Sequence, residues 1–237
     1  MSIECTTLIN GTRFEGFSQF KPIITNALTQ IYSSYNWYEK SGITGEFDGS
    51  NNNYLTASLY FTTESYIKIV MYPGEPHMRI SLVTPTATKE VFTQPTTMDG
   101  SHRSEFFKMS IGKTAYGICI LAYGNSDTII NSRNILFYNL YVGEIIKLDG
   151  TLTKGCVYVA DDGKLTIATD DGVSDEIAQT STINADRNSV LIPIVNTTNG
   201  DRFKDIYFMR YSPIQYNIMD VDGQGVFLCG KALALKD

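Results

Sequence analysis

Residue types that support nucleophilic or metal chemistry are scarce in this sequence. The histidines among its 237 residues are His77 and His102, and both lie in segments rich in turn-forming residues. A Ser or Cys nucleophile commonly needs a histidine base that a third group holds, and the sequence has no Gly-x-Ser-x-Gly motif. Two histidines without ligand spacing also argue against a histidine metal site. We therefore expect no catalytic residue, no metal ligand and no cofactor, and a protein that is not an enzyme.

Two short motifs resemble binding loops but lack essential positions. A Gly-Lys-Thr sequence begins at Gly112, but a phosphate-binding loop needs a further glycine five residues earlier, where this chain has Phe107. An Asp-Val-Asp-Gly sequence begins at Asp220, but a calcium loop needs a carboxylate at its twelfth position, where this chain has Lys231. We interpret both motifs as turns between strands, and leave open a calcium site that distant groups complete around Asp220 and Asp222.

Adjacent carboxylates and isolated cysteines are the remaining candidates. Asp161-Asp162 and Asp170-Asp171 lie in turns, where neighbouring side chains point in different directions, so we expect them to face solvent rather than to form an acid–base pair. The four cysteines are too far apart for a metal motif. Cys119, Cys156 and Cys229 lie in apolar segments, which favours buried thiols over disulfides or reactive groups.

The charge balance disfavours acidic partners. The chain has 25 acidic and 19 basic residues, a formal net charge of −6, and no Lys/Arg cluster. Nucleic-acid binders usually present a basic face and anionic membranes attract basic segments, so we expect neither partner. No segment approaches the roughly 18 apolar residues of a membrane span, and the N-terminus lacks the features of a signal peptide. We expect the protein to stay in the cytoplasm where it is made, unless it leaves as part of an assembly.

One segment has the apolar spacing of an amphipathic helix. Across residues 21–38, apolar residues recur at spacings of three and four. Pro22 suits the first position of a helix, where its missing N–H costs nothing, and Gly42 follows where a stop is needed. The spacing predicts one N-terminal helix over residues 21–38 that packs on a sheet.

Most of the remaining sequence up to residue 141 predicts antiparallel strands. Tyr54–Phe61 and Ser65–Tyr72 are separated by three residues, which predicts a hairpin. A long loop is expected between Thr84 and Ser104. The further strands expected here are Met78–Val83, Glu90–Thr93, Phe106–Ser110, Ala115–Tyr123 and Ile135–Val142.

Turns become more frequent from about residue 142. Asp-Gly pairs that begin at Asp149, Asp162 and Asp171 lie between short apolar runs, which is a strong hairpin signal. The strands expected here are Glu144–Leu148, Cys156–Ala160, Lys164–Ala168, Val190–Val195, Asp205–Arg210, Gln215–Met219 and Val226–Leu233.

These patterns predict a mainly β (α+β) protein. Residues 1–141 would form an antiparallel sheet with the packed helix, and residues 142–237 a small β-barrel or β-sandwich domain, since regular short strands favour those architectures. The boundary is soft, and one continuous domain remains the alternative.

Surface chemistry offers the remaining candidates for function. The chain contains 15 Tyr and 12 Phe, and charged residues make up 19%. Tyr gives a large contact area at small entropic cost, and interfaces are enriched in aromatic residues. Strands also favour Tyr and Thr, which is the alternative explanation. The candidate interaction residues are Tyr35, Trp37, Tyr38, Tyr54, Tyr211 and Tyr216.

A resemblance to a class of proteins is carried by two segments. LDGTLTKGCVYVADDGKLTIATDDG, which lies within residues 143–172, and the C-terminal GVFLCGKALALKD resemble β-barrel segments of bacteriophage virion proteins such as capsid-decoration and tail-associated proteins. The resemblance implies a structural component of the tail, baseplate, neck or capsid decoration. Such a protein is made in the cytoplasm of the host bacterium, is located in the virion, forms homo-oligomers and contacts other virion proteins.

A second hypothesis is a carbohydrate or cell-surface binding module. It would use exposed aromatic rings, such as those of Trp37, Tyr38 and Tyr54, as stacking platforms for a host-surface glycan.

Overall fold

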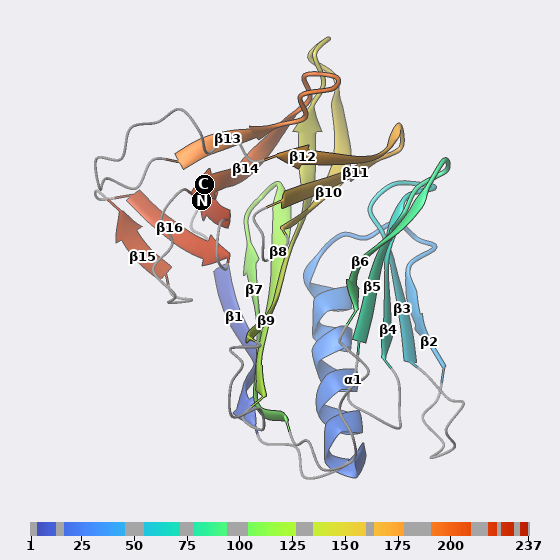
Figure 1. The fold of residues 1–237 in the computed structure, drawn as a ribbon, viewed down its shortest axis with the longest axis vertical. Helices are drawn as coiled ribbons and strands as arrows, with labels where there is room; N and C mark the ends of the chain where they lie inside the picture. Colours follow the sequence, from blue (N-terminus) through green and yellow to red (C-terminus); the bar gives the residue numbers. More distant parts are fainter. Residues whose placement is uncertain are drawn as a thin grey trace.

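Two antiparallel sheets and one long helix make up the fold (Figure 1). The predictions of a mainly β protein and of one packed helix are confirmed. The computed structural model describes residues 4–12, 17–45, 55–71, 78–93, 104–126, 135–159, 164–177, 191–209, 218–221, 224–229 and 233–236.

The larger sheet, sheet A, has twelve strands in the pairing order β1-β7-β8-β9-β14-β17-β16-β15, with β10, β11 and β12 extending from β9, and β13 pairing β14. Its strands are β1 (Glu4–Thr12), β7 (Ser104–Lys113), β8 (Gly117–Ser126), β9 (Ile135–Ile146), β10 (Leu152–Val159), β11 (Lys164–Thr169), β12 (Gly172–Ile177), β13 (Leu191–Val195), β14 (Arg202–Met209), β15 (Ile218–Val221), β16 (Gln224–Cys229) and β17 (Leu233–Lys236).

The smaller sheet, sheet B, has the strand order β2-β3-β4-β5-β6. The predicted hairpin is confirmed as β3 and β4, and β5 has the predicted bounds. Its strands are β2 (Gly42–Thr44), β3 (Leu55–Tyr60), β4 (Tyr66–Met71), β5 (Met78–Val83) and β6 (Thr88–Thr93).

The helix α1 (Phe17–Ser34) begins and ends four residues before the predicted bounds, so the prediction of residues 21–38 was wrong at both ends. Pro22 lies inside the helix rather than at its first position. The end of the helix is set by side chains that satisfy its last carbonyl groups. The Ser34 hydroxyl donates to the Gln30 carbonyl at 2.5 Å, and the Trp37 indole N–H donates to the Ile31 carbonyl at 3.1 Å. The helix therefore ends before Tyr35, although the apolar spacing in the sequence continues past that residue.

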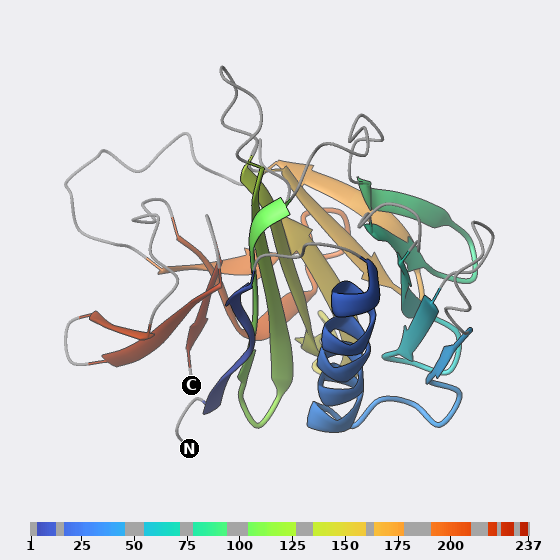
Figure 2. The same ribbon diagram turned by 90° about the horizontal axis from the view of Figure 1, so that it is seen from below.

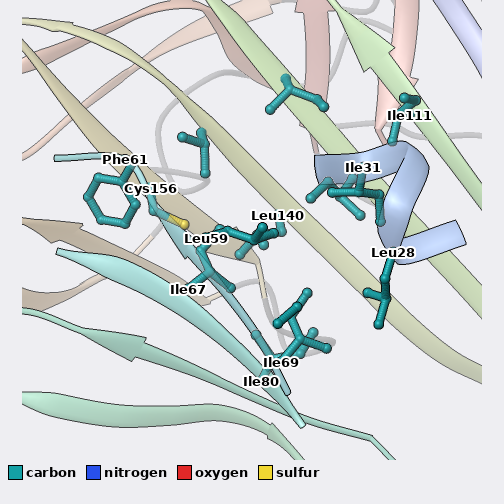
Figure 3. Packing of buried hydrophobic residues seen from close by; sticks show 14 of the residues in the cluster. Leu28, Ile31, Leu59, Phe61, Ile67, Ile69, Ile80, Ile111, Leu140 and Cys156 are labelled. Atoms are coloured by element: carbon teal, nitrogen blue, oxygen red, sulfur yellow. The ribbon is translucent and has the colours of Figure 1, made fainter. Parts of the chain in front are cut away.

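The helix lies between the two sheets, and its apolar stripe joins them into one core (Figure 2). Leu28 and Ile31 of α1 pack with Ile67 of sheet B and Leu140 of sheet A in a single buried cluster, as Figure 3 shows. Burying such side chains contributes about 1.5–3 kcal/mol each to folding. The stripe read from the sequence thus identifies core residues.

The opposite face of sheet A carries a second buried cluster around Tyr141. The Tyr141 ring is fully buried, meets the Phe203 ring edge-on, and its hydroxyl donates to the Lys204 carbonyl at 2.8 Å. The ring covers Gly117 and Gly143, which face each other on β8 and β9. These two glycines leave the space that the large aromatic ring occupies.

The strand β14 bends at Asp205. Arg202 and Phe203 pair β9, whereas residues 206–208 pair β17. Asp205 lies between these two parts with a φ of 60°, in the left-handed region that Asp tolerates better than most residues. The hydroxyl of Thr114 donates to an Asp205 carboxylate oxygen at 2.7 Å and anchors the bend.

The edges of the two sheets meet at β6 and β12. Lys89 of β6 forms an ion pair with Asp175 of β12, and Asp175 also accepts a hydrogen bond from the Thr166 hydroxyl at 2.9 Å. Val91 and Val173, on the same two strands, both pack against the core cluster. Each edge strand thus lies beside the other.

Several strand predictions are corrected by the pairing. The expected strand Glu144–Leu148 is the end of β9, and the expected strand Val226–Leu233 is divided between β16 and β17. Residue 142, the soft boundary expected between two domains, lies inside β9, which pairs β8 and β10 there; the division into two domains or one stays a prediction. The pairing of the described strands of sheet A forms an open path from β1 to β15 rather than a closed barrel.

The contact between Tyr141 and the paired glycines gives a prediction for stability. A methyl group at position 143 would overlap the Tyr141 ring, so Gly143→Ala is expected to lower the free energy of unfolding by about 1–3 kcal/mol through overpacking. Gly42→Ala is the control, because a Cβ at Gly42 meets no atom within 4 Å. Urea denaturation measures both, and equal stability of the two variants would contradict the proposed packing.

Candidate binding surface

The strands β10, β9, β14 and β13 share one face of sheet A. Part of that face is buried in the core, and the part further along the strands is exposed to solvent. In antiparallel pairs, directly opposite residues place their side chains on the same face. Val142 of β9 and Cys156 of β10 are opposite each other and belong to the buried cluster around α1. Further along the same strands, Glu144 lies opposite Lys154, and Ile146 opposite Leu152. These later pairs lie beyond the helix, on the part of the face that reaches solvent.

A row of alternating charges crosses this face. Glu144 lies between Lys154 on β10 and Lys204 on β14, and the Lys204 ammonium is 3.2 Å from a Glu144 carboxylate oxygen. Lys204 also lies 4.0 Å from the centre of the Tyr116 ring. Lys154 lies 5.0 Å from the centre of the Tyr35 ring. Both lysines thus pack on aromatic rings, which attract cations.

Partial burial shifts the pKa values of Lys154 and of the Tyr35 ring that it packs on. Burial lowers the pKa of Lys154, and the neighbouring Glu144 opposes that change. Burial raises the pKa of Tyr35 to about 12, and the Glu144 charge adds to the effect. The Lys154 ammonium donates to the Asn36 carbonyl at 3.3 Å, so it is held against the segment that follows α1.

A row of apolar residues interrupted by Arg202 lies next to the charged one. Leu152, Ile146, Arg202 and Val195 are successive cross-strand neighbours on β10, β9, β14 and β13. Leu148, in the turn after β9, packs beside Gly200 in the turn after β13, and these two turns project together in Figure 1. Leu148 is 83% exposed, Leu152 58% and Val195 40%. We call the surface formed by Ile146, Leu148, Leu152, Val195 and Arg202 the tip surface.

An open groove of about 370 Å³ lies beside the tip surface. It is formed where the segment after α1, the β3–β4 turn and the β11–β12 turn approach β9 and β10. The lining residues are Tyr38, Phe61, Thr62, Thr63, Glu144, Leu152, Thr153, Lys154 and Asp170.

Hydrogen bonds to Asp170 join the two sheets at this groove. One carboxylate oxygen of Asp170 accepts hydrogen bonds from the hydroxyls of Thr62 and Ser65, both at 2.5 Å. The Thr62 hydroxyl oxygen in turn accepts the Ser65 backbone N–H at 2.9 Å and so closes the β3–β4 turn. Asp171 instead lies 3.3 Å from the Lys147 ammonium. The adjacent carboxylates therefore point to different partners, as expected from the sequence.

The structure brings together three of the six predicted interaction residues. Tyr38 lines the groove and is 42% exposed. Tyr35 is half-buried, contacts Lys154, and meets the Trp37 ring edge-on at 4.8 Å. Trp37 is only 8% exposed, so the expectation of an exposed stacking platform at Trp37 was wrong. The hydrogen bond from the Trp37 indole N–H to the Ile31 carbonyl of α1 holds the ring against the core. The other three, Tyr54, Tyr211 and Tyr216, lie outside the described residues.

The two loop-like motifs lie in hairpins. Thr114 closes the turn between β7 and β8, where its backbone N–H donates to the Gly117 carbonyl at 2.9 Å and its hydroxyl oxygen accepts the Gly117 N–H at 3.1 Å. Strands flank this turn on both sides, as interpreted from the sequence. Asp220 lies on β15, which pairs β16. Within the described part of the chain, no group of three or more His, Cys, Asp or Glu residues is placed to hold a metal ion.

Sequence reasoning missed Glu144, Lys154, Leu148 and Leu152. The Asp149-Gly150 pair predicted a hairpin here but not its register. A two-residue Asp-Gly turn would place Glu144 opposite Gly155, whereas the turn spans residues 148–150 and places Glu144 opposite Lys154 and Ile146 opposite Leu152. Lys204 and Val195 had no such signal, because β14 joins β9 from a distant part of the chain.

The chain matches no known protein-family model, no curated protein and no solved structure. No helix among the described residues is long and apolar enough to cross a membrane. The basis for a function is therefore the geometry of the groove and the tip surface.

The contacts of Asp170 give a stability prediction. Asp170→Ala leaves the Thr62 and Ser65 hydroxyls without their acceptor, so the free energy of unfolding is expected to fall by about 1–2 kcal/mol. Asp171→Ala is the matched control, because Asp171 makes an exposed ion pair worth about 0–1 kcal/mol. Thermal and urea unfolding measure both, and an Asp171 effect as large as that of Asp170 would contradict this interpretation.

The cysteines give a prediction for reactivity. Cys5, Cys119 and Cys156 are free thiols, and burial raises the pKa of Cys5 to about 11 and that of Cys156 well above its usual value. Thiolate is the reactive form, so at pH 8 Cys5 is expected to react with iodoacetamide about 100-fold more slowly in the native than in the urea-unfolded protein. Its native rate should rise with pH up to about 11. Peptide mass spectrometry measures each site, and equal native and unfolded rates for Cys5 would refute the expectation.

Proposed function

We propose that the protein is a structural component of a bacteriophage virion, in the tail, baseplate, neck or capsid decoration, and that it acts through contacts with copies of itself and with other virion proteins. The observation that carries the proposal is the tip surface. Leu148, Leu152 and Val195 are exposed together at one projecting end of the molecule. Exposed apolar residues are ordinary when scattered singly, whereas a group of them marks an interaction site.

The composition around the tip surface favours a protein partner. The charged row carries both signs, Lys154 and Lys204 on either side of Glu144, and Tyr35 and Tyr116 pack against the two lysines. Protein interfaces combine apolar anchors and aromatic rings with a polar rim. The tip surface and its charged border have this composition.

A second copy of the chain fits the alternation of charge. The charged rows of two copies can face each other with an offset of one strand. In that arrangement the glutamate of each copy lies opposite a lysine of the other. The neighbouring rows of the two copies, each with Arg202 among its apolar residues, then lie against each other. Surfaces that complement themselves in this way support closed symmetric oligomers. We therefore expect the tip surface to join copies of this chain.

The assignment to a virion rests on the sequence resemblance of residues 143–172. That segment supplies much of the surface: Ile146, Leu148 and Leu152 of the tip surface, and Lys154 and Asp170 of the groove. The part of the chain that resembles virion proteins is thus the part that offers a contact surface.

Disrupting the tip surface tests the proposal. The double variant Leu148→Asp, Leu152→Asp places two charges where apolar contact is expected, so an oligomer should dissociate to the 26.4 kDa monomer. Both side chains are largely exposed, so the fold should be retained. Size-exclusion chromatography with light scattering measures the mass of the wild type and the variant.

Tyr32→Asp is the control, because Tyr32 is a similarly exposed apolar residue on α1, away from the tip surface. It should leave the mass of the oligomer unchanged. A wild-type protein that is strictly monomeric and binds none of the proteins encoded by neighbouring genes would overturn the proposal. So would an oligomer that the double variant leaves intact.

A further inference from the structure

The groove shares Glu144, Leu152 and Lys154 with the surface proposed to join copies, and it adds groups that this contact does not use. Tyr38 offers an exposed ring, while Thr63 and Thr153 offer hydroxyls. Glu144 and Asp170 supply hydrogen-bond acceptors, and Lys154 supplies donors. Small-molecule sites combine aromatic or apolar lining with a few polar groups and have volumes of about 300–1,000 Å³. The groove, at about 370 Å³, lies at the lower end of that range.

Each charged group of the groove already has a partner within the protein. Glu144 pairs with Lys204, and Asp170 accepts the hydroxyls of Thr62 and Ser65. Lys154 donates to a backbone carbonyl and packs on the Tyr35 ring. Counted together, the two lysines Lys154 and Lys204 balance the two carboxylates Glu144 and Asp170, so a ligand with a net charge would meet no net charge of opposite sign.

Hydrogen-bonding capacity nevertheless remains. An ammonium group has three donors and a carboxylate about four acceptor positions, more than the contacts of Lys154 and Asp170 use. Hydroxyl groups suit such a lining, because each one both donates and accepts. A neutral ligand rich in hydroxyls, with an apolar face for the Tyr38 ring, fits these requirements.

We infer that this groove binds a neutral saccharide of one or two sugar units, with Tyr38 as the stacking ring and with Glu144, Lys154 and Asp170 as hydrogen-bonding groups. The groove is open, so the affinity should be weak, about millimolar for a single sugar. Because Glu144, Leu152 and Lys154 belong to both surfaces, the groove is open in the monomer and would be covered where two copies pair over the charged row.

Tyr38 is the position to test, because its structural bonds are made by its backbone. Its N–H donates to the Tyr60 carbonyl at 2.8 Å, and its carbonyl accepts the Ser41 N–H at 2.9 Å. A change of the side chain should therefore leave the fold intact, which circular dichroism checks. Saturation-transfer NMR with glucose, galactose, mannose, N-acetylglucosamine, maltose and lactose is the binding measurement, with galacturonate as the anionic probe.

We expect at least one neutral sugar to bind, and Tyr38→Ala to weaken its binding about tenfold while Tyr38→Phe, which keeps the ring, changes it by less than about threefold. Tyr32→Ala is the control for loss of an exposed ring outside the groove and should have no effect. The inference is overturned if none of the neutral sugars binds, if only galacturonate binds, or if Tyr38→Ala and Tyr32→Ala behave alike.

A variant outside the groove separates this inference from the proposed assembly. Leu148 belongs to the tip surface but does not line the groove, so Leu148→Asp should weaken self-association and, by uncovering the groove, leave sugar binding equal to or stronger than that of the wild type. Parallel loss of sugar binding in this variant would count against a separate saccharide site.

Discussion

The burial of Tyr141 over two facing glycines is the contact on which the larger sheet depends. Up to Gly143, β9 has β8 as its neighbour, and beyond that point β14 takes the place of β8. The Tyr141 ring fills the space above Gly117 and Gly143, and its hydroxyl holds the backbone of β14 at Lys204. Asp205, the next residue, bends β14 toward β17. The Tyr141 side chain therefore links two features: the replacement of β8 by β14 as the neighbour of β9, and the bend of β14 at Asp205.

This exchange also determines where the candidate surface lies. Because β14 joins β9 only at its end, the face that is covered by α1 at Val142 continues past the helix at Glu144 and Ile146. Lys204 and Val195 reach the same face through β14 and β13. The core and the candidate surface are thus successive parts of the same strands.

Local features of the fold were predictable from the sequence, and distant pairings were not. The presence of hairpins at Asp149-Gly150 and Asp171-Gly172 follows from turn chemistry, which acts over a few residues, but their registers do not, because the turns are residues 148–150 and 170–171. The helix was predicted from its apolar spacing, but its end was not, because Trp37 reaches back to a carbonyl that no spacing reveals. The pairing of β14 with β9 joins residues about 60 positions apart, and no local sequence pattern predicts it. Composition therefore identified the Tyr35–Tyr38 segment, whereas the opposite orientations of Trp37 and Tyr38 depend on the folded chain.

The contact between β6 and β12 has a consequence for the exposed edges of the two sheets. Unpaired strand edges are templates on which another chain can add a strand, and proteins commonly blunt them with charge or cover. Here the Lys89–Asp175 ion pair places the border of one sheet against the border of the other. Each of these two borders is thereby covered by the other, which disfavours the addition of a strand from another chain there.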